Sequence, residues 1–194
     1  LELVESNKDR NVLDLGCGRD GIKLAGTYAD GEEYSSFYPK DRFVRTEATE
    51  TPFEDKEFDF VFSLHIIEHI LDPHKFCKEL IRISKRGFIE VPTPFFDNFV
   101  EGNSNPPPHG HVWWITFDDI ENEMVFKPRL SVVREMLVPA DTTNLYPLFR
   151  DSMLLELYWE DTIELRKEDS YYSFTAGNSD PPKIFDLRKK KNAE

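Results

Sequence analysis

The stretch SLHIIEHILDPH, residues 63–74, brings two imidazoles and a carboxylate close together in the sequence. His65, Glu68 and His69 form H-x-x-E-H, a pattern with which one group of metallopeptidases binds zinc. Such a pair of histidines needs one continuous helix, because only then do residues four apart project from the same face. Here the apolar run Phe58–Phe62 predicts a strand just before the motif, and an Asp-Pro pair begins a helix just after it. We therefore expect no metal site.

The glycine-rich turn at residues 16–21 is the second place where chemistry is expected. Gly16, Gly18 and Gly21 satisfy G-x-G-x-x-G, which brings backbone N–H groups close to a ligand. Asp14 precedes this turn, and its carboxylate would repel a pyrophosphate but attract ammonium and sulfonium groups. S-adenosylmethionine is thus favoured over NAD. A purely local role for Asp14, as a hydrogen-bond partner of the turn, stays open.

The elements that must position these residues alternate between strand and helix. A helix is predicted over residues 73–84, because Asp72 is a suitable N-cap and Pro73 suits the first helical position. Strands are predicted at 11–15, 43–46, 58–62 and 87–91, and two later strands at 130–138 and 153–165. This order predicts an α/β fold, Rossmann-like and doubly wound, with a mostly parallel sheet and an antiparallel edge hairpin near the C-terminus.

The domain organisation follows from the same pattern. Residues 1–166 are expected to form one domain, and residues 167–194 a polar C-terminal tail. Within the domain, the proline-rich segment 92–114 is expected to be a loop or lid insertion, because loops of this length in compact domains are usually functional or disordered. A short helix is expected over residues 115–124, with Thr116 as a possible cap and Asp118 and Asp119 in its first turn.

Composition limits the classes of partner. The net charge is −13, which disfavours nucleic acid, because nucleic-acid binders usually present a basic face. No apolar run approaches the roughly 20 residues of a membrane helix. Two cysteines, Cys17 and Cys77, do not indicate a disulfide framework and are compatible with a reducing cytoplasm. We expect a cytoplasmic protein that acts on a small molecule without nucleic-acid or membrane partners, and the sequence leaves its oligomeric state open.

Four motifs in a fixed order carry a resemblance to a known family. They are D-x-G-x-G at residues 14–18, Glu47-Ala48, F-D-x-V at residues 58–61 and Glu68-His69. Over residues 10–95 the chain resembles the class I S-adenosylmethionine-dependent methyltransferases of the small-molecule type called methyltransferase type 11. The family usually has Asp-Ala where this chain has Glu47-Ala48.

The resemblance implies a cofactor, a reaction and a set of site residues. The cofactor is S-adenosylmethionine, and its expected contacts are Asp14, Gly16, Cys17, Gly18, Glu47, Ala48, Ser63 and Leu64. Glu47 would contact the adenine amino group, and Glu68-His69 would brace the loop beside the cofactor. The expected reaction is methyl transfer to a small-molecule or glycan-like metabolite. A hydroxyl or protonated amine acceptor needs a general base, and the candidates are His65, His109 and His111.

Two departures from the family keep alternatives open. The third glycine of the family sits one residue earlier, where this chain has Asp20. Residues 11–46 are also too short for the expected β-α-β-α-β path. The second strand, whose acidic end binds the ribose hydroxyls in the family, cannot be located, although Glu32 or Glu33 could serve. An inactive methyltransferase-like binding protein and an NAD-binding oxidoreductase are therefore the alternative functions.

Overall fold

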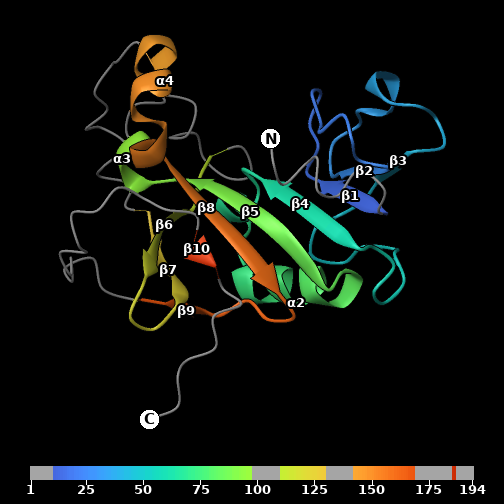
Figure 1. The fold of residues 1–194 in the computed structure, drawn as a ribbon. Helices are drawn as coiled ribbons and strands as arrows, with labels where there is room; N and C mark the ends of the chain where they lie inside the picture. Colours follow the sequence, from blue (N-terminus) through green and yellow to red (C-terminus); the bar gives the residue numbers. More distant parts are fainter. Residues whose placement is uncertain (1–10, 98–109, 130–141, 169–184, 187–194) are drawn as a thin grey trace.

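A seven-stranded sheet forms the centre of the protein (Figure 1). The computed structural model describes residues 11–97, 110–129, 142–168 and 185–186. The order across the sheet is β10-β8-β5-β4-β1-β2-β3. In chain order these strands are β1 (Val12–Leu15), β2 (Thr27–Asp30), β3 (Phe43–Arg45), β4 (Phe60–Leu64), β5 (Arg86–Pro92), β8 (Leu154–Glu160) and β10 (Phe185–Asp186).

Strand direction confirms the expected fold class. β1 lies between β2 and β4 and runs parallel to both, with Leu13 opposite Thr27 on one side and Val61 on the other. β3 and β5 continue the parallel arrangement outward. β8 pairs antiparallel with β5. The first strand of the expected edge hairpin, residues 130–138, lies outside the described residues. Residues 185–186, in the expected polar tail, pair with β8.

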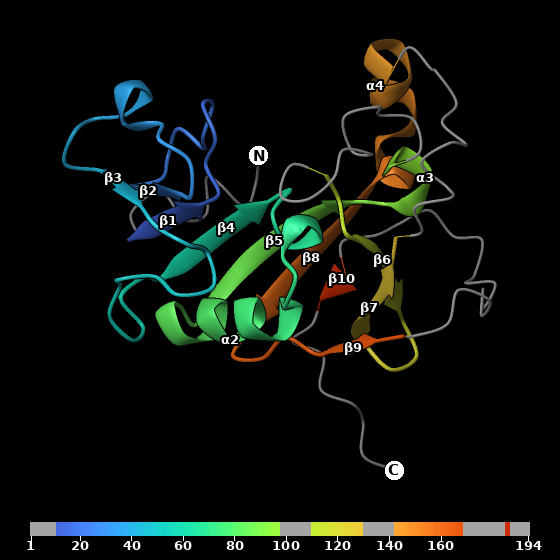
Figure 2. The ribbon, with the colours of Figure 1, turned by 180° about the vertical axis from the view of Figure 1, so that it is seen from behind.

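Helix α2 (Pro73–Ile83) covers one face of the sheet, behind it in Figure 1 and in front of it in Figure 2. The Asp72 side chain accepts a hydrogen bond from the Lys75 N–H and caps the helix as predicted. The helix buries an apolar stripe against alternate residues of the strands. The core on this face includes Leu13, Leu15, Val61, Phe76, Leu80, Ile83, Ile89 and Val91.

The opposite face of the sheet is packed differently. Its buried side chains come from the alternate residues of the same strands, which point to this face. They include Val12, Phe60, Phe62 and Phe88. The segment between β1 and β2 adds Cys17 and Ala25 to this cluster, and β2 adds Tyr28. Among the described residues of the segment between β1 and β3, the only helical turn is the 3-10 helix η1 (Ser35–Phe37). The crossover helices that parallel connections usually contain are therefore replaced here by turns.

The second strand, which sequence reasoning did not locate, is β2. It is short, and the turn-rich segment 16–26 joins it to β1. The acidic residue at its carboxyl end is Asp30, which the sequence did not single out, and Glu32 follows two residues later. As the short spacing predicted, the chain between β1 and β2 forms no helix.

A second, three-stranded sheet has the order β6-β7-β9 and consists of β6 (Trp113–Asp118), β7 (Glu123–Pro128) and β9 (Leu165–Lys167). The helix expected over residues 115–124 was wrong, because β6 and β7 form an antiparallel hairpin there. The Asp118 side chain accepts hydrogen bonds from the Ile120 and Glu121 N–H groups, and Asn122 has φ +56°. The acidic residue that resembled a helix start thus builds the hairpin turn.

Two further helices follow β5 in the chain, and the first lies inside the segment expected to be a lid. α3 (Pro94–Asp97) follows β5 directly, and α4 (Thr142–Met153) leads into β8. Of residues 92–114, the structure describes a strand end, α3 and the approach to β6, while residues 98–109 lie outside the described part. Within the described residues, no helix combines the length and the apolar character needed to cross a membrane.

Candidate functional site

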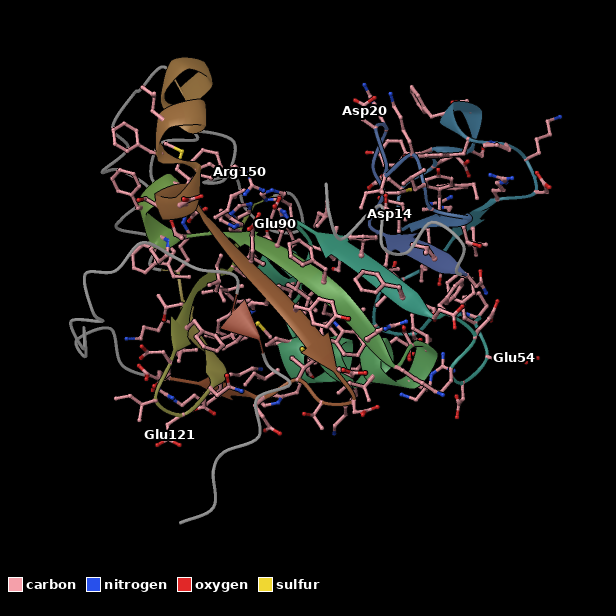
Figure 3. All side chains as sticks on the ribbon, in the orientation of Figure 1. Asp14, Asp20, Glu54, Glu90, Glu121 and Arg150 are labelled. Atoms are coloured by element: carbon pink, nitrogen blue, oxygen red, sulfur yellow. The ribbon has the colours of Figure 1, made fainter. Side chains whose placement is uncertain are left out.

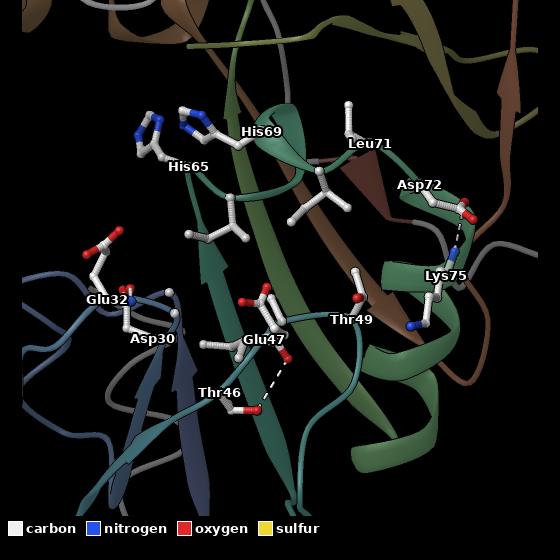
Figure 4. Close-up of a pocket in the computed structure, with 16 residues that line it drawn as sticks. Asp30, Glu32, Thr46, Glu47, Thr49, His65, His69, Leu71, Asp72 and Lys75 are labelled. Carbon is white, nitrogen blue, oxygen red and sulfur yellow. Dashed lines mark hydrogen bonds between the residues drawn. The ribbon is translucent and has the colours of Figure 1, made fainter. Parts of the chain in front are cut away.

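A pocket of about 720 Å³ opens at the carboxyl ends of β1, β2, β3 and β4 (Figure 4). This is the point where the strand order reverses, since β1 connects to β2 on one side and β4 lies on the other. Ligands of open α/β folds bind at such switch points. Acidic, basic and small residues line the pocket. They include Gly16, Asp30, Glu32, Glu47, His65 and Lys75.

Asp30 connects the glycine turn to the end of β2. Its Oδ2 accepts a hydrogen bond from the Gly18 N–H at 2.9 Å, and its Oδ1 accepts one from the Glu32 N–H at 2.9 Å. Gly16 has φ +83°, and a Cβ there would lie 2.0 Å from Ile66 Cδ1. Only glycine fits this position without strain. The turn thus holds a carboxylate at the pocket wall, at a residue that sequence reasoning missed.

The structure brings together only part of the predicted site. Gly16, Glu47, Ala48 and His65 line the pocket. Five predicted cofactor contacts lie close by but outside the lining, namely Asp14, Cys17, Gly18, Ser63 and Leu64. His109 lies outside the described residues. The roles of all these residues stay predictions.

Asp14 points to the sheet face opposite α2, because it alternates along β1 with Leu13 and Leu15. Its Oδ2 accepts a hydrogen bond from the Ile22 N–H at 2.7 Å. Burial raises the pKa of Asp14 to about 6, the hydrogen bond from Ile22 opposes this, and the nearby negative charge of Asp30 adds to it. In this structure Asp14 braces the turn, which is the local role that the sequence left open.

Asp14 should make stability depend on pH. Its pKa is about 6 in the folded protein and 3.8 in an unfolded chain, so the folded state binds more protons between these values. The contribution of Asp14 to the free energy of unfolding should be most favourable below pH 3.8. It should be lost as the pH rises through 6. For a shift of roughly two units the loss is about 3 kcal/mol. The Asp14→Asn variant should lack this loss.

Urea denaturation of both proteins between pH 4.5 and 7.5 measures the effect. Subtracting the two curves removes the titration of all groups that the proteins share. The variant should gain stability over the wild type as the pH rises, because the buried negative charge is absent. A difference between the two proteins that stays constant over this range contradicts the argument.

Cys17 is buried beside the same turn. Burial raises the pKa of its thiol to about 11, so the thiol is neutral near pH 7. The Tyr38 hydroxyl lies 3.0 Å from the carbonyl oxygen of Cys17 and 2.8 Å from that of Gly18. The Gly21 N–H donates a hydrogen bond to the same hydroxyl oxygen at 2.9 Å. Cys17 and Tyr38 therefore stabilise the turn through packing and backbone contacts.

His65 lies at the end of β4 in a left-handed backbone conformation, with φ +57°. Its N–H donates a hydrogen bond to the Glu90 carbonyl oxygen at 2.8 Å, and its Nε2 lies 3.2 Å from Glu90 Oε1. Glu90 in turn receives a hydrogen bond from Arg150 at 2.9 Å (Figure 3). These contacts hold a histidine in a conformation that few non-glycine residues adopt.

The charge of His65 follows from its neighbours. Burial acts to lower its pKa, but the carboxylates of Glu68 and Glu90 outweigh this and raise the pKa to about 9. The Nδ1 atom lies 3.6 Å from Glu68 Oε1, and 43% of the side-chain surface is exposed. The ring is therefore protonated at neutral pH, and a protonated ring has no lone pair with which to accept a proton.

Glu68 and His69 contact the segment that leads into β6, and their expected role in bracing the loop beside the cofactor stays a prediction. They belong to the 3-10 helix η2 (Ile67–His69). The Val112 N–H donates to the Glu68 carbonyl oxygen at 2.9 Å, and His69 Nδ1 lies 3.2 Å from the Gly110 carbonyl oxygen. His111 is buried in this contact region and does not line the pocket. The predicted break in the H-x-x-E-H motif is confirmed, since no helix spans residues 65–69.

Known proteins match the part of the chain that builds this pocket. Residues 13–89 match a family model described as a methyltransferase domain. An ajmaline N-methyltransferase of Rauvolfia serpentina is 31% identical over 41% of this chain and 34% of its own length. A chloroplastic tocopherol O-methyltransferase of Arabidopsis thaliana is 33% identical over 43% of this chain and 29% of its own length. The solved YcgJ protein of Bacillus subtilis is 22% identical, with a TM-score of 0.45, over 57% of this chain and 59% of its own.

The extent of these matches is limited. The chain spans about a third of the length of the two plant relatives. The alignment with the ajmaline enzyme has 102 positions but occupies only 41% of this 194-residue chain. The relative therefore has additional residues inside the aligned region.

Proposed function

We propose that this chain, whose residues 13–89 match a methyltransferase-domain model, is a class I S-adenosylmethionine-dependent methyltransferase. It would transfer the methyl group of this cofactor to a small-molecule or glycan-like acceptor. The observation that carries the proposal is the meeting of Gly16, Asp30 and Glu47 in one pocket at the switch point of the sheet. When bound, the cofactor supplies an electrophilic methyl group on a sulfonium cation. The protein's share is to hold the acceptor in line with it.

The donors and acceptors in the pocket fit this cofactor. Asp30 and Glu32 offer carboxylate oxygens at the end of β2, where two adjacent ribose hydroxyls would find acceptors. Glu47 offers an acceptor for an adenine amino group, and Ala48 beside it offers a small apolar surface. The negative charge of this wall also favours a cationic ligand over a pyrophosphate. We assign Gly16, Asp30, Glu47 and Ala48 to the cofactor.

The acceptor would enter on the side of His65. This residue lies on the pocket wall, and His69 lies beside it (Figure 4). Of the three histidines proposed as a general base, His65 is the one that lines the pocket. Its protonated ring would orient the acceptor by donating a hydrogen bond rather than take up its proton. The net charge of −13 and the small volume of the pocket support a small molecule rather than a nucleic acid. Both cysteines are free, which fits the reducing cytoplasm that we propose as its location.

The test is isothermal titration calorimetry with S-adenosylmethionine, S-adenosylhomocysteine and NAD. We expect the first two to bind and NAD to give no heat of binding. Absence of binding by the first two at millimolar concentration would overturn the proposal. The shortened connection between β1 and β2 favours a second candidate, a methyltransferase-like protein that binds the cofactor without turnover. Transfer of labelled methyl to any acceptor excludes that candidate.

A further inference from the structure

Beside the pocket, a carboxylate and two imidazoles converge from distant parts of the sequence. They belong to Glu68, His69 and His111, and one possible ligand atom of each lies within 4.8 Å of the others. Glu68 and His69 come from η2, and His111 comes from the segment that leads into β6. The backbone contacts of Gly110 and Val112 with η2 bring the two segments together.

Among the described residues, Glu68 is a buried carboxylate without hydrogen-bond donors. Only 1% of its surface is exposed, and within the described part of the chain neither carboxylate oxygen has a hydrogen-bond partner. The nearest ring nitrogens are His65 Nδ1 at 3.6 Å and His111 Nε2 at 3.9 Å from Oε1. Burying a carboxylate without donors is costly. The His65 ring approaches Oε1 from one side only and makes no hydrogen bond with it, so the carboxylate has room for a further cation.

His111 faces this carboxylate with a lone pair. Its Nδ1 lies 2.5 Å from Asp97 Oδ1. The other oxygen of Asp97 lies 2.7 Å from Arg129 Nε and accepts a hydrogen bond from Trp114 Nε1 at 3.1 Å. Asp97 is thus held as an acceptor, and the Nδ1–H of His111 donates to it. In the neutral ring Nε2 is then the acceptor, and it points towards Glu68.

His69 is oriented in the same way. Its Nδ1 lies 3.2 Å from the Gly110 carbonyl oxygen, which can only accept, so Nδ1 carries the proton. The lone pair is left on Nε2. The rings of His69 and His111 meet edge to face, with centroids 4.6 Å apart. Two imidazole lone pairs and a buried carboxylate therefore converge.

We propose that Glu68, His69 and His111 bind a divalent transition-metal cation of the zinc class. Imidazole and carboxylate are ligands of this class, and two histidines with one glutamate form a known three-ligand set that leaves a position open. Ligating histidines usually donate their second N–H to a carboxylate or backbone carbonyl, as His111 and His69 do here to Asp97 and Gly110. His69 also lines the pocket, so the metal would border it.

This site differs from the one that the H-x-x-E-H pattern suggests. His65 turns towards Glu90 and is replaced in the set by His111. Tetrahedral zinc with bonds of about 2.0 Å holds its ligand atoms roughly 3.3 Å apart. The ligand atoms lie within 4.8 Å of one another, so binding requires the three side chains to approach each other by up to about 1.5 Å. Without a metal, a protonated His111 would pair with both Asp97 and Glu68, and this is the alternative that the test must exclude.

Zinc titration of the untagged full chain, dialysed first against a chelator, tests the site without the methyl donor. Calorimetry should show one equivalent of Zn²⁺, and Co²⁺ should give the visible absorption of a low-symmetry site. Glu68→Gln keeps the size of the side chain and should weaken Zn²⁺ binding by at least about 10- to 100-fold. His74→Asn is the matched control, because His74 is exposed on α2, and should bind as the wild type does.

Two results would overturn the proposal. One is a folded wild type without stoichiometric Zn²⁺ binding, which would indicate the protonated His111 instead. The other is equal Zn²⁺ affinity in the wild type and Glu68→Gln, which would indicate binding elsewhere on the surface. If Glu68→Gln does not fold, the wild-type stoichiometry and the Co²⁺ spectrum still decide. Neither result bears on the cofactor pocket, which is measured by its own titration.

Discussion

Replacing Asp30 with asparagine should weaken the binding of S-adenosylmethionine and S-adenosylhomocysteine by roughly 10- to 100-fold, the value of a hydrogen bond to a charged group. In the wild type, the Asp30 carboxylate faces the pocket and would accept hydrogen bonds from the ribose hydroxyls. The asparagine keeps one oxygen but loses the negative charge and the second acceptor. Isothermal titration calorimetry of both ligands measures the change.

Glu33→Gln is the matched control for Asp30→Asn. Glu33 is an exposed acid in the same segment, does not line the pocket, and accepts a hydrogen bond from the Ser35 N–H that glutamine can also accept. Glu33→Gln removes one negative charge, as Asp30→Asn does. Equal affinity loss in the two variants would mean that only the overall charge matters. Unchanged affinity in Asp30→Asn would remove this residue from the cofactor site.

Replacing Gly87 in β5 with alanine should strongly destabilise the protein. A Cβ at this position would lie 2.4 Å from the Val61 carbonyl oxygen, 2.8 Å from Val61 Cγ1 and 2.9 Å from Trp159 Cε2. The carbonyl belongs to the neighbouring strand β4, so the clash is with backbone that cannot rotate away. Gly87→Ala should therefore lower the free energy of unfolding by about 3 kcal/mol or more, which is roughly 10 °C in Tm.

Gly26→Ala is the control for this change. The nearest atom to a Cβ at Gly26 is the Val12 carbonyl oxygen at 3.7 Å, which is an ordinary contact. The free energy of unfolding should stay within about 0.5 kcal/mol of the wild type. Urea denaturation of the three proteins compares them directly. Equal stability of Gly87→Ala and Gly26→Ala would show that the two central strands can separate to admit the methyl group.

The helix and the central strands follow from local patterns that sequence reasoning can detect. The Asp72-Pro73 start predicted α2, and the apolar runs predicted β1, β4 and β5. Tertiary contacts override such patterns where an element is very short or polar. β2 has four residues and no detectable period, so Asp30 went unnoticed. The acidic pair at 118–119 resembled a helix start but lies at a hairpin turn.

The candidate site likewise contains features that the sequence predicts and features that depend on tertiary contacts. The sequence by itself determined the order of strands and turns around Gly16, Glu47 and His65, because each follows a recognisable strand or turn and carboxyl ends of parallel strands meet at one edge. Only the tertiary structure decided that Asp30 lines the pocket and that Asp14 does not. It also decided that His111 lies beside Glu68, because that approach depends on contacts between segments far apart in the chain. Spacing within a single motif cannot encode such a contact.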